Sequence, residues 1–323
     1  MPVTRRDFVR TLFAASQTAL VGKLLTTSAQ ADDAFTGALN FAVIGDWGRH
    51  GRPDQMAVAQ EMGLACAQSS AAFVISVGDN FYEDGVKSVD DKHWQKSFEG
   101  VYTSPSLQVP WYAALGNHDY KGSVQAQLDY AKAGGRWKMP ARYWRQAVTV
   151  DAATQAEFFF IDTSPMIKSY TRRPENKQMG LELAALGPTY VQQQLAWLDH
   201  ALGSSTAPWK IVTGHHPIYS AGFGHSSEHE LITTLLPILQ KHGVQAYFCG
   251  HDHDLQHLQT GKTTLIISGG GSEHLPVFTI PESKFSRACS GFTLVSLRAH
   301  EMQVRFIDDE GKLLHTASVP RVA

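Results

Sequence analysis

The sequence predicts an α/β protein built as a single domain. Its 323 residues are enough for one large core. In the first half, apolar runs of strand length alternate with a helical pattern, which is typical of parallel strands joined by helices. Five apolar runs along the chain end in a glycine followed by a polar side chain that can bind a metal ion. The sequence therefore predicts both the fold class and a site at the strand ends.

The first half of the chain predicts three strands and two helices. Residues 72–77 are apolar except for Ser76, so this strand is expected to be buried on both faces. Residues 53–68 have apolar side chains at helical spacing, with Pro53 in the first turn, where proline is tolerated. The other expected elements are a helix at 90–99 and strands at 39–44 and 109–115.

The second half predicts more strands and a mainly antiparallel C-terminal part. Residues 163–187 are polar and irregular, which predicts a long loop. Residues 190–202 predict a helix with its leucines on one face, and residues 228–242 predict another. Strands are expected at 142–150, 157–161, 209–213, 244–249, 255–259, 264–267, 292–297, 303–307 and 313–319.

Residues 1–31 have the pattern of an export signal. Arg5 and Arg6 form a twin-arginine pattern, a mildly apolar run follows, and Ala29-Gln30-Ala31 is an A-x-A cleavage site. The alternatives are a retained transmembrane helix, which needs about 20 apolar residues, and a disordered basic N-terminus. We expect the twin-arginine export machinery to deliver residues 32–323 to the periplasm or the outside as a monomer without stable membrane insertion.

The charge, the cysteine content and the absence of certain motifs disfavour several classes of protein. The formal net charge is −2 and no basic block follows the leader, which disfavours nucleic-acid binding. The three cysteines are too few and too scattered for a disulfide framework or a zinc knuckle, although one bridge is possible. No glycine-rich kinase loop, Walker pattern or serine-hydrolase elbow is present.

Seven residues are candidate metal ligands. Side chains at positions i and i+2 after a strand leave the backbone on the same side, so His251 and His253 can converge on one point. Taken alone, Asp46 and Asn117 also suit tight turns, and Tyr82 also suits core packing. The full set is Asp46, Asp79, Tyr82, Asn117, His215, His251 and His253.

This donor set predicts the kind of centre. Seven donors exceed what one ion needs and suit two ions that share a carboxylate. Oxygen and nitrogen donors without thiolate indicate iron, zinc or manganese. The phenolate of Tyr82 would favour a trivalent ion, because its usual pKa near 10 must be lowered by a strong positive charge.

The candidate ligands lie in five motifs: Asp46-Trp47-Gly48, Gly78-Asp79-Asn80-Phe81-Tyr82, Gly116-Asn117-His118-Asp119, Val212-Thr213-Gly214-His215 and Gly250-His251-Asp252-His253. These motifs resemble those of the purple acid phosphatases, which belong to the metallophosphoesterase superfamily. Gly48 stands where the wider superfamily has a metal-binding histidine, and Tyr82 is supplied instead. The similarity extends over about 39–319 and is greatest to the small, mammalian-like tartrate-resistant type.

The resemblance implies a sandwich of two mixed β-sheets flanked by helices, with the site at the strand ends. It implies an acid phosphatase that hydrolyses monoesters by attack of a metal-bound hydroxide. Fe(III) would be bound by Asp46, Tyr82, His253 and the bridging Asp79. A divalent ion (Fe, Zn or Mn) would take Asn117, His215, His251 and the same Asp79.

The neighbours of these ligands supply candidates for acid catalysis and substrate binding. His118 could protonate the leaving group, with Asp119 as its partner, or could only donate to phosphate. Asn117, His118 and His216 are the candidate substrate contacts. For His225 and His229 the sequence leaves two interpretations open: one of them could be a second general acid, or both could be surface histidines.

Two other functions remain open from the sequence. A phosphodiesterase or phospholipase-like enzyme could use the same ions. The site could also serve as a phosphate-binding or redox module with little hydrolysis.

Overall fold

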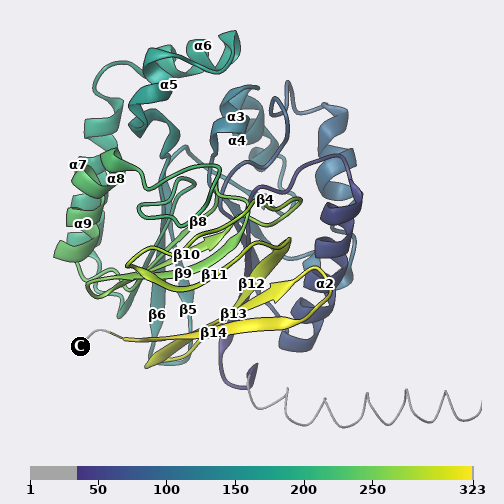
Figure 1. Cartoon of the computed structure of the whole chain (residues 1–323), viewed down its shortest axis with the longest axis vertical. Helices are drawn as coiled ribbons and strands as arrows, with labels where there is room; N and C mark the ends of the chain where they lie inside the picture. Colours follow the sequence, from purple (N-terminus) through teal and green to yellow (C-terminus); the bar gives the residue numbers. More distant parts are fainter. Residues whose placement is uncertain (1–34, 322–323) are drawn as a thin grey trace, which may run out of the picture. The chain divides into compact units, whose positions relative to one another are not determined.

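The computed structural model describes residues 35–321, and from Ala38 onward the chain forms one compact unit. This unit contains two seven-stranded sheets (Figure 1). The predicted export signal at 1–31 lies outside the described residues and stays a prediction.

The first sheet is mixed. Strands β1, β2, β3 and β4 are parallel neighbours, and β12 pairs antiparallel with β1. The sheet order is β14-β13-β12-β1-β2-β3-β4. The bounds are β1 Leu39–Ile44, β2 Phe73–Ser76, β3 Trp111–Ala113, β4 Trp137–Lys138, β12 Gly291–Leu297, β13 Glu301–Asp308 and β14 Leu313–Pro320.

The second sheet is also mixed, in the order β11-β9-β10-β8-β7-β6-β5. Strands β6, β7, β8 and β10 are parallel. β5 pairs antiparallel with β6, β9 pairs antiparallel with β10, and β11 pairs antiparallel with β9. The bounds are β5 Trp144–Thr149, β6 Gln155–Phe160, β7 Trp209–Thr213, β8 Ala246–Cys249, β9 Leu255–Thr260, β10 Thr263–Ser268 and β11 Ser283–Arg287.

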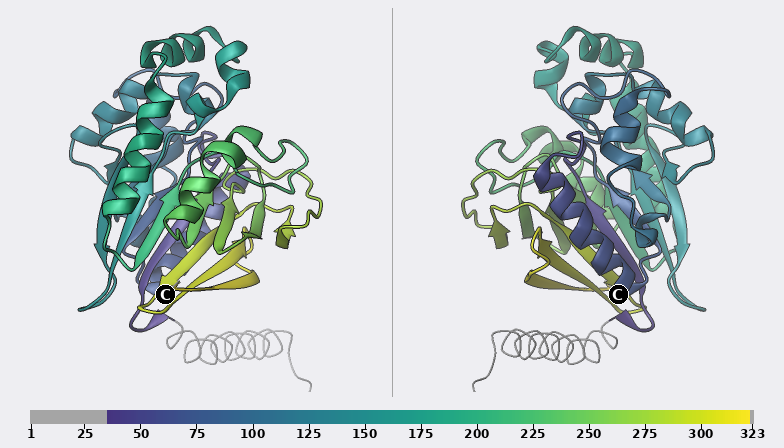
Figure 2. Two further views of the ribbon diagram at one scale, coloured as in Figure 1. Left: turned by 90° about the vertical axis from the view of Figure 1, so that its left-hand side faces the viewer. Right: turned by 90° about the vertical axis from the view of Figure 1, so that its right-hand side faces the viewer.

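Helices cover the outer faces of the two sheets, as Figures 1 and 2 show. Helix α2 packs on β1 and β12 of the first sheet. Helices α7, α8 and α9 pack on the second sheet, with Leu198 and Leu202 in one cluster with Val212. The bounds are α2 Pro53–Ser69, η1 Trp94–Glu99, η2 Pro105–Leu107, α3 Asn117–Tyr120, α4 Val124–Lys132, η3 Ser164–Met166, α5 Lys168–Arg172, α6 Lys177–Leu186, α7 Tyr190–Ser204, α8 His229–Thr234 and α9 Leu236–Lys241.

Aromatic side chains from both sheets fill the space between them. The rings of Phe41 on β1 and Phe158 on β6 meet edge to face with centroids 5.4 Å apart, and both residues are fully buried. Phe248 on β8 lies 6.3 Å from Phe41 by the same measure. Edge-to-face packing of this kind favours a fixed relation between the sheets. The sandwich of two mixed sheets is confirmed.

Two predictions of local structure are wrong. The segment 163–187 is not an irregular loop, because it contains η3, α5 and α6. The helix expected at 228–242 is two short helices, α8 and α9, divided at Leu235 just before Pro237. Proline lacks the backbone donor that a continuous helix needs, which favours the break.

Two further features concern the state of the cysteines and the ability of the helices to cross a membrane. Cys66, Cys249 and Cys289 are free thiols within the described part of the chain. Between residues 35 and 321, none of the helices has both the length and the apolar character needed to cross a bilayer.

Candidate metal centre

The seven predicted ligands come together where parallel strands of both sheets end. β1, β2 and β3 lead into Asp46, Asp79 and Asn117, and β7 and β8 lead into His215 and His251. The carboxyl ends of parallel strands are the usual place for a site in such folds. None of the seven residues is more than 8 % exposed.

The turns that carry these ligands have an unusual backbone. Asp46, Asp79 and His251 have φ angles of 61°, 49° and 70°, a left-handed conformation that costs a non-glycine residue about 1–2 kcal/mol. Gly78 has φ of 97°, and a Cβ there would lie 2.7 Å from the ring of His215. The chain therefore needs glycine at this position and turns sharply to aim the next side chain into the site.

One half of the site is built around the phenol oxygen of Tyr82. This oxygen lies 2.9 Å from Oδ1 of Asp46, 2.9 Å from Oδ2 of Asp79 and 3.0 Å from Nε2 of His253. The Nδ1 atom of His253 lies 2.8 Å from Glu273 Oε1, which leaves Nε2 facing the other three donors. Four donors therefore converge on one small volume.

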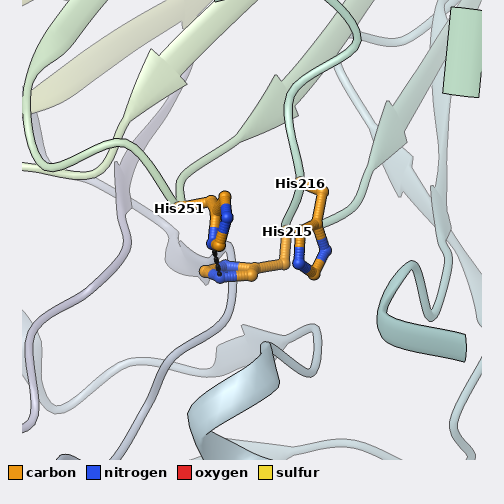
Figure 3. Close-up of side chains that lie close together, drawn as sticks. All are labelled: His215, His216 and His251. Carbon is orange, nitrogen blue, oxygen red and sulfur yellow. Dashed lines mark hydrogen bonds between the residues drawn. The ribbon is translucent and has the colours of Figure 1, made fainter. Parts of the chain in front are cut away.

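The other half is built around Nε2 of His215. Nδ1 of His215 donates to the carbonyl of Val77 at 3.0 Å, so in the neutral ring the lone pair is on Nε2. Nε2 lies 3.2 Å from Asn117 Oδ1 and 3.2 Å from His251 Nδ1. Figure 3 shows the two imidazole rings of His215 and His251 meeting at this contact.

Asp79 joins the two halves through a single oxygen. Its Oδ2 lies 2.9 Å from the Tyr82 oxygen and 3.4 Å from His215 Nε2. Its Oδ1 accepts the backbone N–H of His118 at 2.8 Å. Oδ2 is thus the oxygen that faces both donor sets, as a bridging carboxylate would.

The buried carboxylates of the site favour the binding of a cation. Burial, together with the carboxylates of Asp46 and Asp79, raises the pKa of Tyr82 well above its usual value, so the phenol stays protonated while only these groups surround it. Against the effect of burial, His215 and His118 lower the pKa of Asp79 well below its usual value. A multiply charged cation between these oxygens would reverse the effect on Tyr82, because it stabilises the phenolate.

Among the three candidate ligand histidines, two have a raised pKa and one has a lowered pKa. Although burial opposes it, Asp79 and Asp46 raise the pKa of His215 to about 9. Asp46 and Glu273 raise the pKa of His253 to about 10, again against burial. Burial and the neighbouring histidines lower the pKa of His251 well below its usual value.

These donors fit metal ions by position as well as by type. Ligand atoms of Asp46, Asp79 and His215 lie within 4.8 Å of one another. The buried nitrogens of His215 and His251 face each other at 3.2 Å, a distance that suits two ligands of one ion.

A cavity of about 310 Å³ opens beside these donors. His118 lies at its wall, and its Nδ1 donates to the carbonyl of Glu83 at 2.6 Å. Nε2 of this ring lies 3.2 Å from Nζ of Lys121 and 4.0 Å from Oδ2 of Asp79. The lining residues are Arg49, Asp79, Tyr82, Glu83, Asn117, His118, Glu175, His225, His251, His253 and Glu273.

The structure does not place Asp119 at the cavity, where a catalytic partner of His118 was expected. Asp119 is fully buried and does not line the cavity. Its carboxylate accepts hydrogen bonds from the backbone of Gly116 and Asn80 and from the side chain of Gln127. It therefore holds the turns after β2 and β3 together instead of facing a substrate.

The structure does not place His216 at the cavity either, where a substrate contact was expected. His216 is fully buried and does not line the cavity. Figure 3 shows its ring beside those of His215 and His251. Its nitrogens lie within 4.8 Å of those of His215 and His251, which would also suit a metal ligand. Nδ1 contacts Thr163 at 2.8 Å and Nε2 contacts the Tyr170 hydroxyl at 3.3 Å. Both nitrogens are thus engaged, and His216 supports the site from behind.

Sequence reasoning missed or left open several residues at the cavity. The ring of His225 packs on that of His251 with centroids 3.8 Å apart, whereas His229 is exposed at the start of α8. Glu175 lies in the segment expected to be a loop, and its Oε1 accepts from Nδ2 of Asn117 at 3.2 Å. Arg49 could have been found from the sequence, because it lies three residues after the candidate ligand Asp46, in the turn after β1.

Comparisons with known proteins agree with this geometry. Residues 39–255 match the calcineurin-like phosphoesterase family. The chain is similar to Purple acid phosphatase 4 of Arabidopsis thaliana, 42% identical over 287 residues, which cover 86% of this chain and 83% of the relative. It is also similar to tartrate-resistant acid phosphatase type 5 of Homo sapiens, 33% identical over 320 residues, which cover 90% of this chain and 94% of the relative.

A solved structure shows a similar fold. The protein GAP50, described as the anchor in the inner membrane complex of Plasmodium, superposes with a TM-score of 0.76 at 25% identity. The match covers 88% of this chain and 89% of that one.

Proposed function

Since this chain belongs to the calcineurin-like phosphoesterases and, among them, to the purple acid phosphatases, we propose that it hydrolyses phosphate monoesters at a centre of two metal ions. The family makes it a metal-dependent phosphoesterase. The two-ion centre and the preference for monoesters are the proposal.

The observation that carries the two-ion centre is the position of Asp79 Oδ2. This oxygen faces Tyr82 on one side and His215 on the other. We assign Asp46, Tyr82 and His253 to one ion. We assign Asn117, His215 and His251 to the second ion, with Asp79 shared by both.

The chemistry of each donor set indicates which ion it holds. A phenolate with two carboxylates is a hard, strongly donating set, so we assign Fe(III) to the half with Tyr82. Two imidazoles and an amide oxygen suit a divalent ion, Fe, Zn or Mn. When bound, such ions supply Lewis acidity, which acidifies water and withdraws charge from the phosphoryl group.

The residues of the cavity orient the ester. Nδ2 of Asn117 donates to Glu175, so its Oδ1 is turned toward His215, and a phosphoryl oxygen could replace Glu175 as the acceptor. Nε2 of His118 faces the cavity because Nδ1 is bound to the carbonyl of Glu83. Nε2 accepts from Nζ of Lys121 at 3.2 Å, so a proton on Nε2 would have to replace this contact before it could pass to the leaving-group oxygen.

The test compares initial rates on a phosphate monoester and a diester with the same leaving group, with metal content measured on the same sample. We expect the monoester to be the better substrate. A clear preference for the diester would favour the phosphodiesterase or phospholipase-like alternative. Binding of phosphate without turnover of either ester would favour a binding or redox module.

We also propose that the protein is exported through the twin-arginine machinery to the periplasm or beyond. The support is the sequence pattern at Arg5 and Arg6 alone. Replacing both arginines by lysine should keep the protein in the cytoplasm, as fractionation and immunoblotting would detect. Unchanged export of that variant would contradict this proposal.

A further inference from the structure

A second cavity, of about 460 Å³, is separate from the cavity of the metal centre, and the two share no lining residue among residues 35–321. Side chains of β4, the last strand of the first sheet, and of β5, the last strand of the second, both line it. It therefore lies at the edge of the sandwich where the chain crosses between the sheets through residues 139–143. The lining residues are Tyr112, Ala131, Lys132, Lys138, Met139, Pro140, Trp144 and Gln146.

Aromatic rings from both sheets form an apolar wall of this cavity. The rings of Tyr112 on β3 and Trp144 on β5 meet edge to face with centroids 5.8 Å apart. The ring of Phe160 stacks on that of Trp144 at 4.2 Å, which covers one face of the indole and holds it in place. Met139 and Pro140 add further apolar surface. A rigid apolar wall and a volume of this size are typical of a site for a small molecule with a flat ring.

Three hydrogen-bond donors at this cavity have no partner. Lys138 and Tyr112 are register partners on β4 and β3, so their side chains leave the same face of the sheet. Within residues 35–321, neither the ammonium of Lys138 nor the hydroxyl of Tyr112 makes a hydrogen bond or an ion pair. Trp144 is 8% exposed, and its Nε1 is buried without a partner. Donors without an acceptor favour a ligand that brings one.

The charges around the cavity indicate how many negative charges such a ligand has. Nζ of Lys132 lies 2.7 Å from Oδ1 of Asp129, so this cation is already paired. Lys138 has no such carboxylate, and the lining residues include neither aspartate nor glutamate. One positive charge is therefore left over, which matches a ligand with a single negative charge.

We propose that this cavity binds a free aromatic monocarboxylate. The ring of the ligand packs against Tyr112 and Trp144, and its carboxylate accepts from the ammonium of Lys138 and the hydroxyl of Tyr112. A charge-assisted hydrogen bond of this kind is stronger than one between neutral groups. The site is independent of the metal centre and of the reaction proposed there. An inward-pointing lysine can also protect an edge strand from pairing with another chain, so the test separates these two roles of Lys138.

The test is isothermal titration calorimetry of the purified, metal-loaded protein with 2-naphthoate and with neutral 2-naphthamide, which has the same rings. We expect 2-naphthoate to bind and 2-naphthamide to bind about 10-fold more weakly, because only the carboxylate pairs with Lys138. Lys138→Met should weaken binding of 2-naphthoate by a similar factor and leave that of 2-naphthamide almost unchanged. Ala131→Phe places a ring in the cavity and should abolish binding of both. Lys262→Met, at an exposed lysine between β9 and β10, is the control and should bind as wild type.

Circular dichroism shows whether the variants fold, and Ala131→Leu replaces Ala131→Phe if that variant does not. No binding of 2-naphthoate at millimolar concentrations, or equal affinity for the two ligands, would overturn the proposal. The same affinity in wild type, Lys138→Met and Ala131→Phe would place the ligand elsewhere, for example at the metal centre, and would also overturn it. Stronger self-association of Lys138→Met at unchanged affinity for 2-naphthoate would mean that Lys138 only protects the edge of the sheet.

Discussion

The backbone N–H of His118 donates a hydrogen bond of 2.8 Å to Oδ1 of Asp79, and this contact turns Oδ2 toward both halves of the site. Oδ2 then lies 2.9 Å from the Tyr82 oxygen and 3.4 Å from His215 Nε2. The first turn of α3 thus orients the carboxylate that we assign as the bridge between two ions.

The bridge predicts the effect of Asp79→Asn. The amide keeps the shape of the side chain but removes the negative charge that both ions would share. We expect loss of both ions by elemental analysis and a fall in turnover of more than about 100-fold, since even outer-shell changes cost 10–100-fold. Asp90→Asn, at an exposed carboxylate, is the control. Retention of both ions by Asp79→Asn would contradict the bridging assignment.

The position of His118 predicts a leaving-group dependence. If Nε2 protonates the departing oxygen, His118→Asn should lower kcat by about 10²–10⁴-fold for an alkyl phosphate. The loss should be much smaller for 4-nitrophenyl phosphate, whose leaving group needs no proton. His229→Asn, at an exposed histidine, should change neither rate. Equal losses on both esters would mean that His118 only binds the phosphate.

The buried carboxylate of Asp119 predicts a loss of stability. Asp119→Ala would leave the donors of Gly116, Asn80 and Gln127 unsatisfied in the core. We expect the free energy of unfolding to fall by about 2–3 kcal/mol, measured by denaturant titration. Direct acid catalysis by Asp119 would instead appear as a changed pH–rate profile at unchanged stability.

A histidine pair on β9 and β14 predicts a pH dependence of stability. His257 and His315 face each other at 3.1 Å, and burial, with the charges of His315 and Lys284, lowers the pKa of His257 to about 4. Between pH 6.5 and 4 the unfolded chain binds a proton that the folded chain excludes. Stability is therefore full above pH 6.5 and is lost as the pH falls through this window.

The matching experiment is urea unfolding of wild type and His257→Gln at pH 7.5 and pH 4.5. Between these pH values, the wild type should lose on the order of 1 kcal/mol more than the variant, after allowance for partial exposure. His300→Gln, at an exposed histidine, should behave as wild type. Equal losses in wild type and His257→Gln would contradict the role of this pair.

The convergence of the seven candidate ligands could be predicted from the sequence because the signal is local. A strand, a glycine and a polar residue specify both the place of a side chain and its direction, as the turn at Gly78 and Asp79 shows. Asp119 was misplaced for the opposite reason. It follows His118 on helix α3, where neighbouring side chains point about 100° apart, so adjacency in sequence does not mean a shared direction.

The two α-helices between 163 and 187 differ in how far the sequence indicates them. Helix α5 buries no side chain, so hydrophobic periodicity gives no signal for it. Helix α6 has Met179, Leu183 and Leu186 at helical spacing, and its N-cap Asn176 accepts the backbone N–H of Met179, so this helix had a signal that was missed. Glu273 and Glu175 were missed because their place at the site depends on how distant loops fold over it.

The most direct test of the central claim is the visible absorption spectrum of oxidised wild type and Tyr82→Phe, with metal content measured on both. We predict a violet to purple band in the wild type, from Tyr82 bound to Fe(III), and no such band in the variant. A wild-type protein that binds its metals but is colourless, or a band that survives in Tyr82→Phe, would contradict the iron–tyrosinate centre.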